Sequence, residues 1–265
     1  MWLYTSCHLH FELSTPSPFI LMLRPRNDLR QWVTREDYSI EPKVQILEYT
    51  DSFGNLCQRL TAPEGEFFIS SSSLVKTTEN IDLGYGAPFI EIQNLPNNII
   101  PFLLPSRYCE SDRLGQLAIE IIGDARDGYD QVASILEWVQ STVQYAPGSS
   151  YMSMSAVEVK QQGYGVCRDL AHLCIALCRA ISIPARMVVG YLHELEPMDL
   201  HAWFDAYVGD RWYTFDPTLS SPRGGRVTIA YGRDASDVAV YTKFGPPVNF
   251  SSMDVEVNLM DGPPT

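Results

Sequence analysis

The sequence lacks the features expected of a membrane, secreted or nucleic-acid-binding protein. It contains no run of the ~18 consecutive apolar residues that a membrane-spanning helix needs. Residues 1–6 have neither the basic stretch nor the apolar core of a signal peptide. Lys and Arg total 19 against 32 Asp and Glu, and the net charge of −13 disfavours contact with phosphate backbones. We therefore expect a cytoplasmic protein that binds neither nucleic acid nor membranes.

The cysteines lack the spacing of a metal site or a redox motif. No Cys-x-x-Cys pair occurs among the six, and free thiols are expected in a reducing compartment. A zinc site made by Cys167, Cys174 and Cys178 is disfavoured, because Cys167 and Cys174 would lie ~10 Å apart along a helix and zinc holds each thiolate at ~2.3 Å. No acidic loop is dense enough to predict calcium binding. The sequence thus implies no metal and no cofactor.

The first hundred residues have the pattern of β-strands separated by turns. Branched and aromatic residues gather in short runs at Leu9–Leu13, Phe19–Leu23, Lys43–Tyr49, Leu56–Thr61 and Glu66–Ser70. Such strands pack naturally as two antiparallel layers. We therefore predict an N-terminal β-sandwich-like domain over residues 1–100, ending in a Pro- and Asn-rich connector.

The rest of the chain, residues 101–265, has the pattern of an α+β domain. Helical periodicity predicts helices over Ser111–Ile122, Asp130–Val143, from near Ser155, and over 167–181. The last of these is apolar on most sides, so it is expected to be buried. A strand over Ala185–Leu192 and a hairpin over His201–Phe215 follow it. The prediction is a buried helix packed on an antiparallel sheet.

Cys167 stands at the predicted start of the buried helix, after a turn that contains Gly163 and Gly165. A thiol at this place faces unpaired backbone N–H groups and the positive end of the helix dipole, which favour thiolate. The same N–H groups could bind an oxyanion that forms beside the sulfur. Cys174 and Cys178 lie inside the helix and are interpreted as core residues. Cys167 is therefore the candidate nucleophile.

His201 and Asp216 are expected to meet across the predicted hairpin. A two-residue loop at Gly209-Asp210 sets a register in which the two side chains are diagonal neighbours on one face. Their Cβ atoms would then lie ~7–8 Å apart, whereas Asp205 lies ~13 Å along the strand from His201. Asp216 is thus the better candidate to orient the histidine, although a purely structural histidine stays open on this pattern alone.

Three blocks of the sequence resemble the signature of bacterial transglutaminase-like proteins. They are Gly165–Leu173 (GVCRDLAHL), His201–Trp203 (HAW) and Trp212–Thr218 (WYTFDPT), in the family's order and spacing. The segment Gly232–Ala239 and the N-terminal β-rich region are also similar to parts of that family. The resemblance implies a papain-like core behind an N-terminal β domain, and it covers nearly the whole chain.

The resemblance also implies roles for the residues that match its blocks. Cys167 would be the nucleophile, His201 the base and then the acid, and Asp216 the orienting carboxylate. The Cys167 backbone N–H would stabilise the oxyanion. Where true transglutaminases place a Trp upstream of the cysteine, this chain has Gln144-Tyr145, and Tyr145 becomes the candidate second donor.

Two classes of function follow. The first is a cysteine hydrolase or acyltransferase, a peptidase or transglutaminase-like enzyme that acts on peptide or protein amides through a thioester. A related amidase acting on glycans or small amides would use the same residues. The second class is a non-catalytic binding or scaffold module that retains the fold. The sequence leaves open whether water or an amine accepts the acyl group, and it indicates no oligomeric state.

Overall fold

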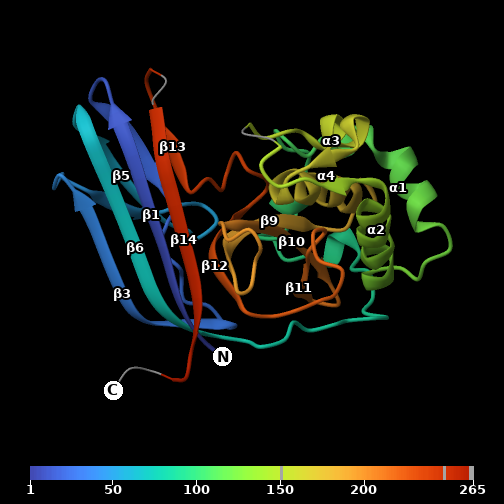
Figure 1. Ribbon diagram of the computed structural model, residues 1–265. Coiled ribbons are helices and arrows are strands. Elements are labelled where there is room, and N and C mark those ends of the chain that lie inside the picture. Colours follow the sequence, from blue (N-terminus) through green and yellow to red (C-terminus); the bar gives the residue numbers. More distant parts are fainter. Residues whose placement is uncertain (150–151, 247–248, 263–265) are drawn as a thin grey trace.

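The computed structural model describes residues 1–149, 152–246 and 249–262, with the side chains of 249–251 left aside. Figure 1 shows a β-sandwich on one side and a helix-covered sheet on the other. Within these residues, none of the helices is long and apolar enough to cross a membrane. The predicted α+β class is confirmed.

The β-sandwich consists of two four-stranded antiparallel sheets. Their cores meet around aromatic side chains, where the Phe11 and Phe67 rings lie 5.2 and 5.8 Å from that of Phe19. In sheet order, the first sheet is β14 (Asn249–Met260), β1 (Trp2–Leu13), β6 (Gly65–Thr77) and β3 (Gln31–Glu41). The second is β13 (Tyr241–Lys243), β2 (Ser17–Leu21), β5 (Leu56–Ala62) and β4 (Leu47–Thr50).

Two features of the sandwich differ from the sequence prediction. Strand β3 was not predicted, because it is an edge strand whose exposed positions are largely polar, so it has no apolar run. The last strands, β13 and β14, pair with β2 and β1 and so belong to the sandwich. Sheet pairing therefore departs from the predicted division into 1–100 and 101–265: the chain returns to its first domain at its end.

The second part of the molecule packs helices on one four-stranded antiparallel sheet. Its strand order is β11 (Arg211–Phe215), β10 (His201–Val208), β9 (Ala185–Leu192) and β12 (Arg226–Gly232). The buried helix α4 (Cys167–Ala180) packs on β9 and β10, while β12 contacts the sandwich through β6. The other α-helices are α1 (Gly115–Ile122), α2 (Tyr129–Thr142) and α3 (Ala156–Gln162).

Short elements complete the frame around α4. Three single turns of 3-10 helix, at Ile92–Asn94, Ile100–Leu103 and Ser111–Arg113, lead from the sandwich to α1. The predicted cap Ser111 thus begins a separate 3-10 turn, and α1 itself begins at Gly115. The short strands β7 (Gln144–Tyr145) and β8 (Tyr164–Gly165) pair in parallel just before α4.

Candidate active site

The first turn of α4 places Cys167 at the helix N-terminus, as predicted. The backbone N–H of Val166, the cap residue, donates to Asp169 Oδ2 at 3.2 Å and so fixes the entry into the helix. A Cβ on Gly165 would lie 2.9 Å from the Asp169 Cβ, so only glycine fits this turn. Cys167 is partly exposed, whereas the other five cysteines are buried. The sequence therefore places the one partly exposed cysteine at the N-terminus of a helix.

The segment before α3 is anchored to the first turns of α4. Met154 N donates to Asp169 Oδ1 at 3.1 Å, and Met154 O accepts from His172 Nδ1 at 2.8 Å. His172 Nε2 in turn accepts from Ala235 N at 3.2 Å. Burial lowers the pKa of His172 to about 4, which keeps the ring neutral, so it can donate and accept at once. This histidine is a structural residue beside the site.

The β10–β11 hairpin brings His201 and Asp216 together. Its register pairs Val208 with Arg211 and Phe204 with Phe215, which is the predicted one. His201 Nε2 donates to Asp216 Oδ2 at 2.8 Å, and both side chains are buried. The expected diagonal contact therefore exists.

Asp205, the rejected candidate, has other partners. Its Oδ2 accepts from Arg186 Nε and Nη2 at 3.0 and 2.9 Å, and its Oδ1 accepts from Thr214 Oγ1 at 2.9 Å. This carboxylate is saturated by neighbours on the middle of the sheet. The distances inferred from the sequence thus correctly chose Asp216, and not Asp205, as the partner of His201.

Electrostatics at the site favour an imidazolium beside a carboxylate. Burial by itself would lower the pKa of His201, but the Asp216 charge and hydrogen bond, together with the Cys167 thiol, raise it to about 9. Burial would likewise raise the pKa of Asp216, yet Arg226, His201 and Thr218 hold it well below its usual range. Asp216 is therefore ionised across the ordinary pH range.

The Cys167 thiol is close enough to His201 to interact with its ring. His201 Nδ1, the nitrogen not used by Asp216, has no aligned hydrogen-bond partner among the residues described. Hydrogen bonds between catalytic groups are often long or poorly aligned before substrate binds. The two halves of the site, which the sequence could join only by resemblance, lie side by side.

Tyr145 lies beside the turn into α4, because β7 pairs it with Gly165 of β8. Burial raises its pKa to about 12, and the nearby Cys167 and Asp216 add to that effect. The phenol is therefore neutral and keeps its proton as a hydrogen-bond donor. Its location agrees with the predicted one near the nucleophile.

Two residues around Asp216 escaped the sequence prediction. Thr218 donates to Asp216 Oδ1 through its backbone N–H (3.0 Å) and its Oγ1 (2.7 Å). The Asp-Pro-Thr order could have signalled this turn, since Asp side chains often accept from the N–H two residues later. Arg226 Nη2 donates to Asp216 Oδ2 at 2.8 Å from the start of β12. No local pattern marks that arginine.

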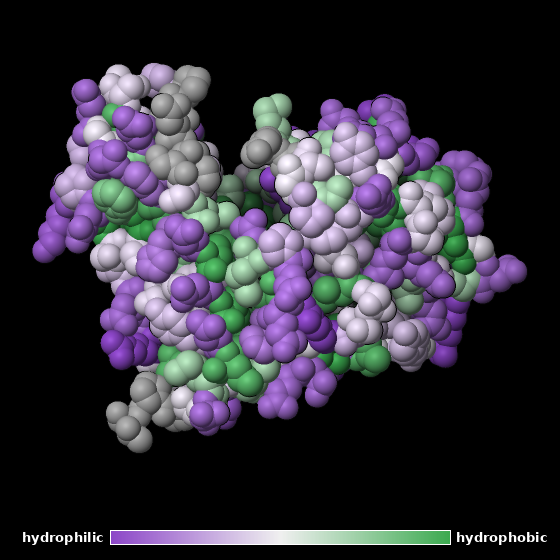
Figure 2. Space-filling view, viewed as in Figure 1, coloured by the Kyte–Doolittle hydropathy of each residue, from purple (hydrophilic) through white to green (hydrophobic). Residues whose placement is uncertain are grey.

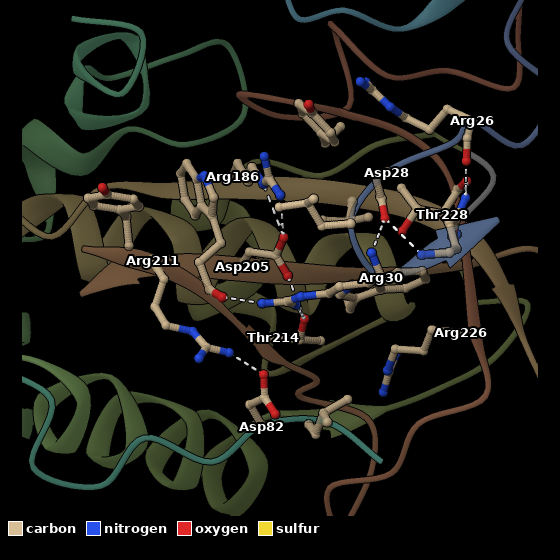
Figure 3. A pocket seen from close by; sticks show the side chains of 18 of the residues that line it. Arg26, Asp28, Arg30, Asp82, Arg186, Asp205, Arg211, Thr214, Arg226 and Thr228 are labelled. Atoms are coloured by element: carbon tan, nitrogen blue, oxygen red, sulfur yellow. Dashed lines mark hydrogen bonds and ion pairs between the residues drawn. The ribbon is translucent and has the colours of Figure 1, made fainter. Parts of the chain in front are cut away.

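A cavity of about 940 Å³ lies where the β-sandwich meets the sheet. Arginine and aspartate side chains from both parts point into it, including Arg30, Arg186, Arg226 and Asp205 (Figure 3). Cys167 does not line it. The face seen in Figure 2 mixes hydrophilic and hydrophobic residues and is hollowed between the two parts. The cavity and Cys167 thus lie at different places, and Arg226, which lines the cavity, also contacts Asp216.

Comparison with known proteins shows the family of the chain. Residues 115–217 match the model of the transglutaminase-like superfamily, and residues 12–76 match the bacterial transglutaminase-like N-terminal region. A crystal structure described as a "Putative Cysteine Protease from Cytophaga hutchinsonii" is 37% identical with a TM-score of 0.91, covering 100% of this chain and 92% of the other. The chain belongs to the transglutaminase-like superfamily.

Relatives of the chain also occur among curated bacterial proteins. An uncharacterized protein of Mycobacterium leprae is 28% identical over 230 residues, which covers 82% of each chain. One of Mycobacterium tuberculosis is 26% identical over 265 residues, covering 88% of this chain and 84% of the other. The superfamily match spans Cys167, His201 and Asp216 but ends before Arg226.

Proposed function

We propose that the protein is a cysteine hydrolase or acyltransferase that acts on amide or peptide carbonyls through Cys167, His201 and Asp216. The observation that carries the proposal is the buried His201–Asp216 hydrogen bond of 2.8 Å beside a partly exposed thiol at a helix start. An oriented histidine next to a thiol is the general requirement of thiol catalysis. The superfamily membership and the protease-like relative support it further.

The first step is activation of the sulfur. Asp216 accepts from His201 Nε2, which leaves Nδ1 as the acceptor for the proton of the Cys167 thiol. Transfer of that proton gives a thiolate and an imidazolium. The imidazolium is stabilised by Asp216, and the thiolate by the N-terminal end of α4.

Acylation and release follow from this geometry. The thiolate attacks the carbonyl carbon, and the resulting oxyanion accepts from the Cys167 backbone N–H and the Tyr145 hydroxyl. His201 then gives its proton to the departing nitrogen as the C–N bond breaks. The nitrogen leaves as an amine, and the acyl group stays on Cys167 as a thioester. Water or a second amine, deprotonated by neutral His201, attacks the thioester and restores the thiol. The acyl group thereby passes to an acid or to a new amide.

The proposed substrate is a peptide or protein amide. A partly exposed thiol at the protein surface can meet an extended chain, and the protease description of the similar crystal structure points to the same class. Trapping with cell extract tests this directly: the wild-type protein, quenched in acid after the incubation, should retain a covalent adduct on Cys167 whose mass identifies the acyl donor. An adduct with a glycan or small-amide acyl group would redirect the proposal to the related amidase.

Alkylation by iodoacetamide tests the nucleophile itself. Near neutral pH, mass spectrometry should find Cys167 modified well before Cys57 and Cys109, which are buried. Burial also raises the pKa of Cys109 to about 12, so that thiol stays protonated. Equal or slower modification of Cys167 would contradict the activated thiol and favour a non-catalytic scaffold.

A further inference from the structure

Arg226 shares one carboxylate oxygen with the candidate base. Asp216 Oδ2 accepts from His201 Nε2 and from Arg226 Nη2, each at 2.8 Å. Asp216 Oδ1 accepts twice from Thr218. The carboxylate therefore makes four hydrogen bonds and has one orientation. Arg226 is positively charged at every ordinary pH, whereas His201 loses its charge above its raised pKa and Thr218 carries none.

The guanidinium of Arg226 is itself held in place. It lies over the Trp203 ring at 4.9 Å, and its Nε donates to Arg223 O at 3.3 Å. The side chain is 8% exposed. Its Nη1 is buried without a partner among the described residues, which is unfavourable for stability. A buried ion pair of this kind often contributes little to the stability of a fold, so its placement calls for a functional reason.

The β-sandwich fixes the backbone that carries Arg226. Thr77 Oγ1, at the end of β6, donates to Arg226 O at 2.7 Å, and Gly225 N donates to Thr78 O at 2.9 Å. A Cβ on Gly224 would lie 2.4 Å from the Glu79 carbonyl carbon, so the two segments touch backbone to backbone. The path from the sandwich to the base thus runs through Thr77, Arg226 and Asp216.

We propose that Arg226 is a positioning residue through which the β-sandwich orients Asp216 and weakens the electrostatic attraction between the Asp216 carboxylate and the His201 ring. This inference rests on the proposed function and gives the N-terminal domain a part in it. The charged or titratable groups around His201 are Asp216, Cys167 and Asp199. With Arg226 present, the single charge of Asp216 is divided between two cations. Neutral His201, the form needed to deprotonate the acyl acceptor, therefore remains accessible.

Titration of His201 by NMR in the full-length protein tests the proposal without any substrate. The chain has five histidines, and a His201→Gln variant assigns the signal. Arg226→Met keeps the contact with Trp203 but removes the charge, so the His201 pKa should rise by about one unit, a tenfold change in its protonation equilibrium. Arg226→Lys should stay near the wild type. A His201 titration that is unchanged or lowered in Arg226→Met overturns the proposal.

Two further variants sharpen the test. Arg186→Met removes a matched arginine that is ion-paired with Asp205 on the same sheet and also stacked on aromatic rings, and it should leave the His201 titration unchanged. A shift equal to that of Arg226→Met would make the effect nonspecific and overturn the proposal. Thr77→Val removes the sandwich's hydrogen bond and should raise the His201 pKa by a smaller amount. An unchanged His201 pKa in Thr77→Val would contradict the link to the sandwich. This result holds even if Arg226→Met does not fold.

The readout separates this inference from the proposed function. Selective alkylation of Cys167 tests the nucleophile, whereas the His201 titration tests Arg226. If Cys167 proves unreactive, the proposed function fails while the titration still decides the role of Arg226. If Cys167 reacts selectively and the titration does not move, the function stands and only the positioning role is lost.

Discussion

Two aspartates of the β10–β11 region share the same kind of arginine partner but differ in their other contacts. Asp205 pairs with Arg186, which stacks on Trp212, and Asp216 pairs with Arg226, which stacks on Trp203. Only Asp216 also contacts a histidine beside an accessible thiol. Burial and an arginine partner therefore do not define the site. The contact with His201 is the feature that Asp216 has and Asp205 lacks.

The largest effect is expected from loss of the base that joins Asp216 to the thiol. His201→Gln should slow any turnover by about a thousandfold, because positioned acid–base groups contribute on this scale. It should slow the alkylation of Cys167 near neutral pH by about tenfold, because an unassisted thiol is still a few per cent thiolate. Rates measured by mass spectrometry against the wild type check this. Retention of wild-type reactivity would mean that His201 is only structural.

The two aspartates can be compared directly by neutral substitution. Asp216→Asn should lower turnover by a hundredfold or more, roughly the scale seen when such a carboxylate is neutralised, and it should also lower the reactivity of Cys167 towards alkylation. Asp205→Asn should leave reactivity near the wild type. Each leaves a buried arginine unpaired, so both should lose about 3 kcal/mol of unfolding free energy. Equal loss of reactivity in both variants would erase the distinction between them.

Removal of the Tyr145 hydroxyl tests the oxyanion contact. Tyr145→Phe should lower turnover of an amide substrate by about a hundredfold, because loss of one oxyanion donor costs that much. Alkylation of Cys167 forms no oxyanion and should stay nearly unchanged in the same variant. Parallel loss of both rates would point to a damaged fold instead.

The smallest effect is a dependence of stability on pH. The folded pKa of His201, about 9, lies above its ordinary 6.5. His201 therefore stabilises the fold fully below about pH 6.5, and this stabilisation is lost as the pH rises through 9. Denaturant unfolding at pH 6.5 and 9 should show a decrease in the wild type and a smaller one in His201→Gln. Asp216 acts with the opposite sign, because its lowered pKa gives stability that is lost only in strong acid.

Local patterns predicted much of the site. The start of α4 at Cys167 and the hairpin register between β10 and β11 both follow from short-range rules of capping, turn chemistry and alternation. The same rules chose Asp216 over Asp205. They missed β3, whose exposed positions are largely polar, and they did not indicate that β13 and β14 pair with β2 and β1, because pairing across the whole sequence leaves no local mark.

The sequence by itself determined the helix that presents Cys167 and the hairpin that joins His201 to Asp216. Tertiary structure decided that these two units meet, and it brought Arg226 from β12 to the Asp216 carboxylate and Thr77 from β6 to the backbone of Arg226. The physical reason is the distance along the chain over which each interaction acts. Capping and strand register act over a few residues, whereas the contacts of Arg226 depend on how a sandwich closed by both ends of the chain packs against the sheet.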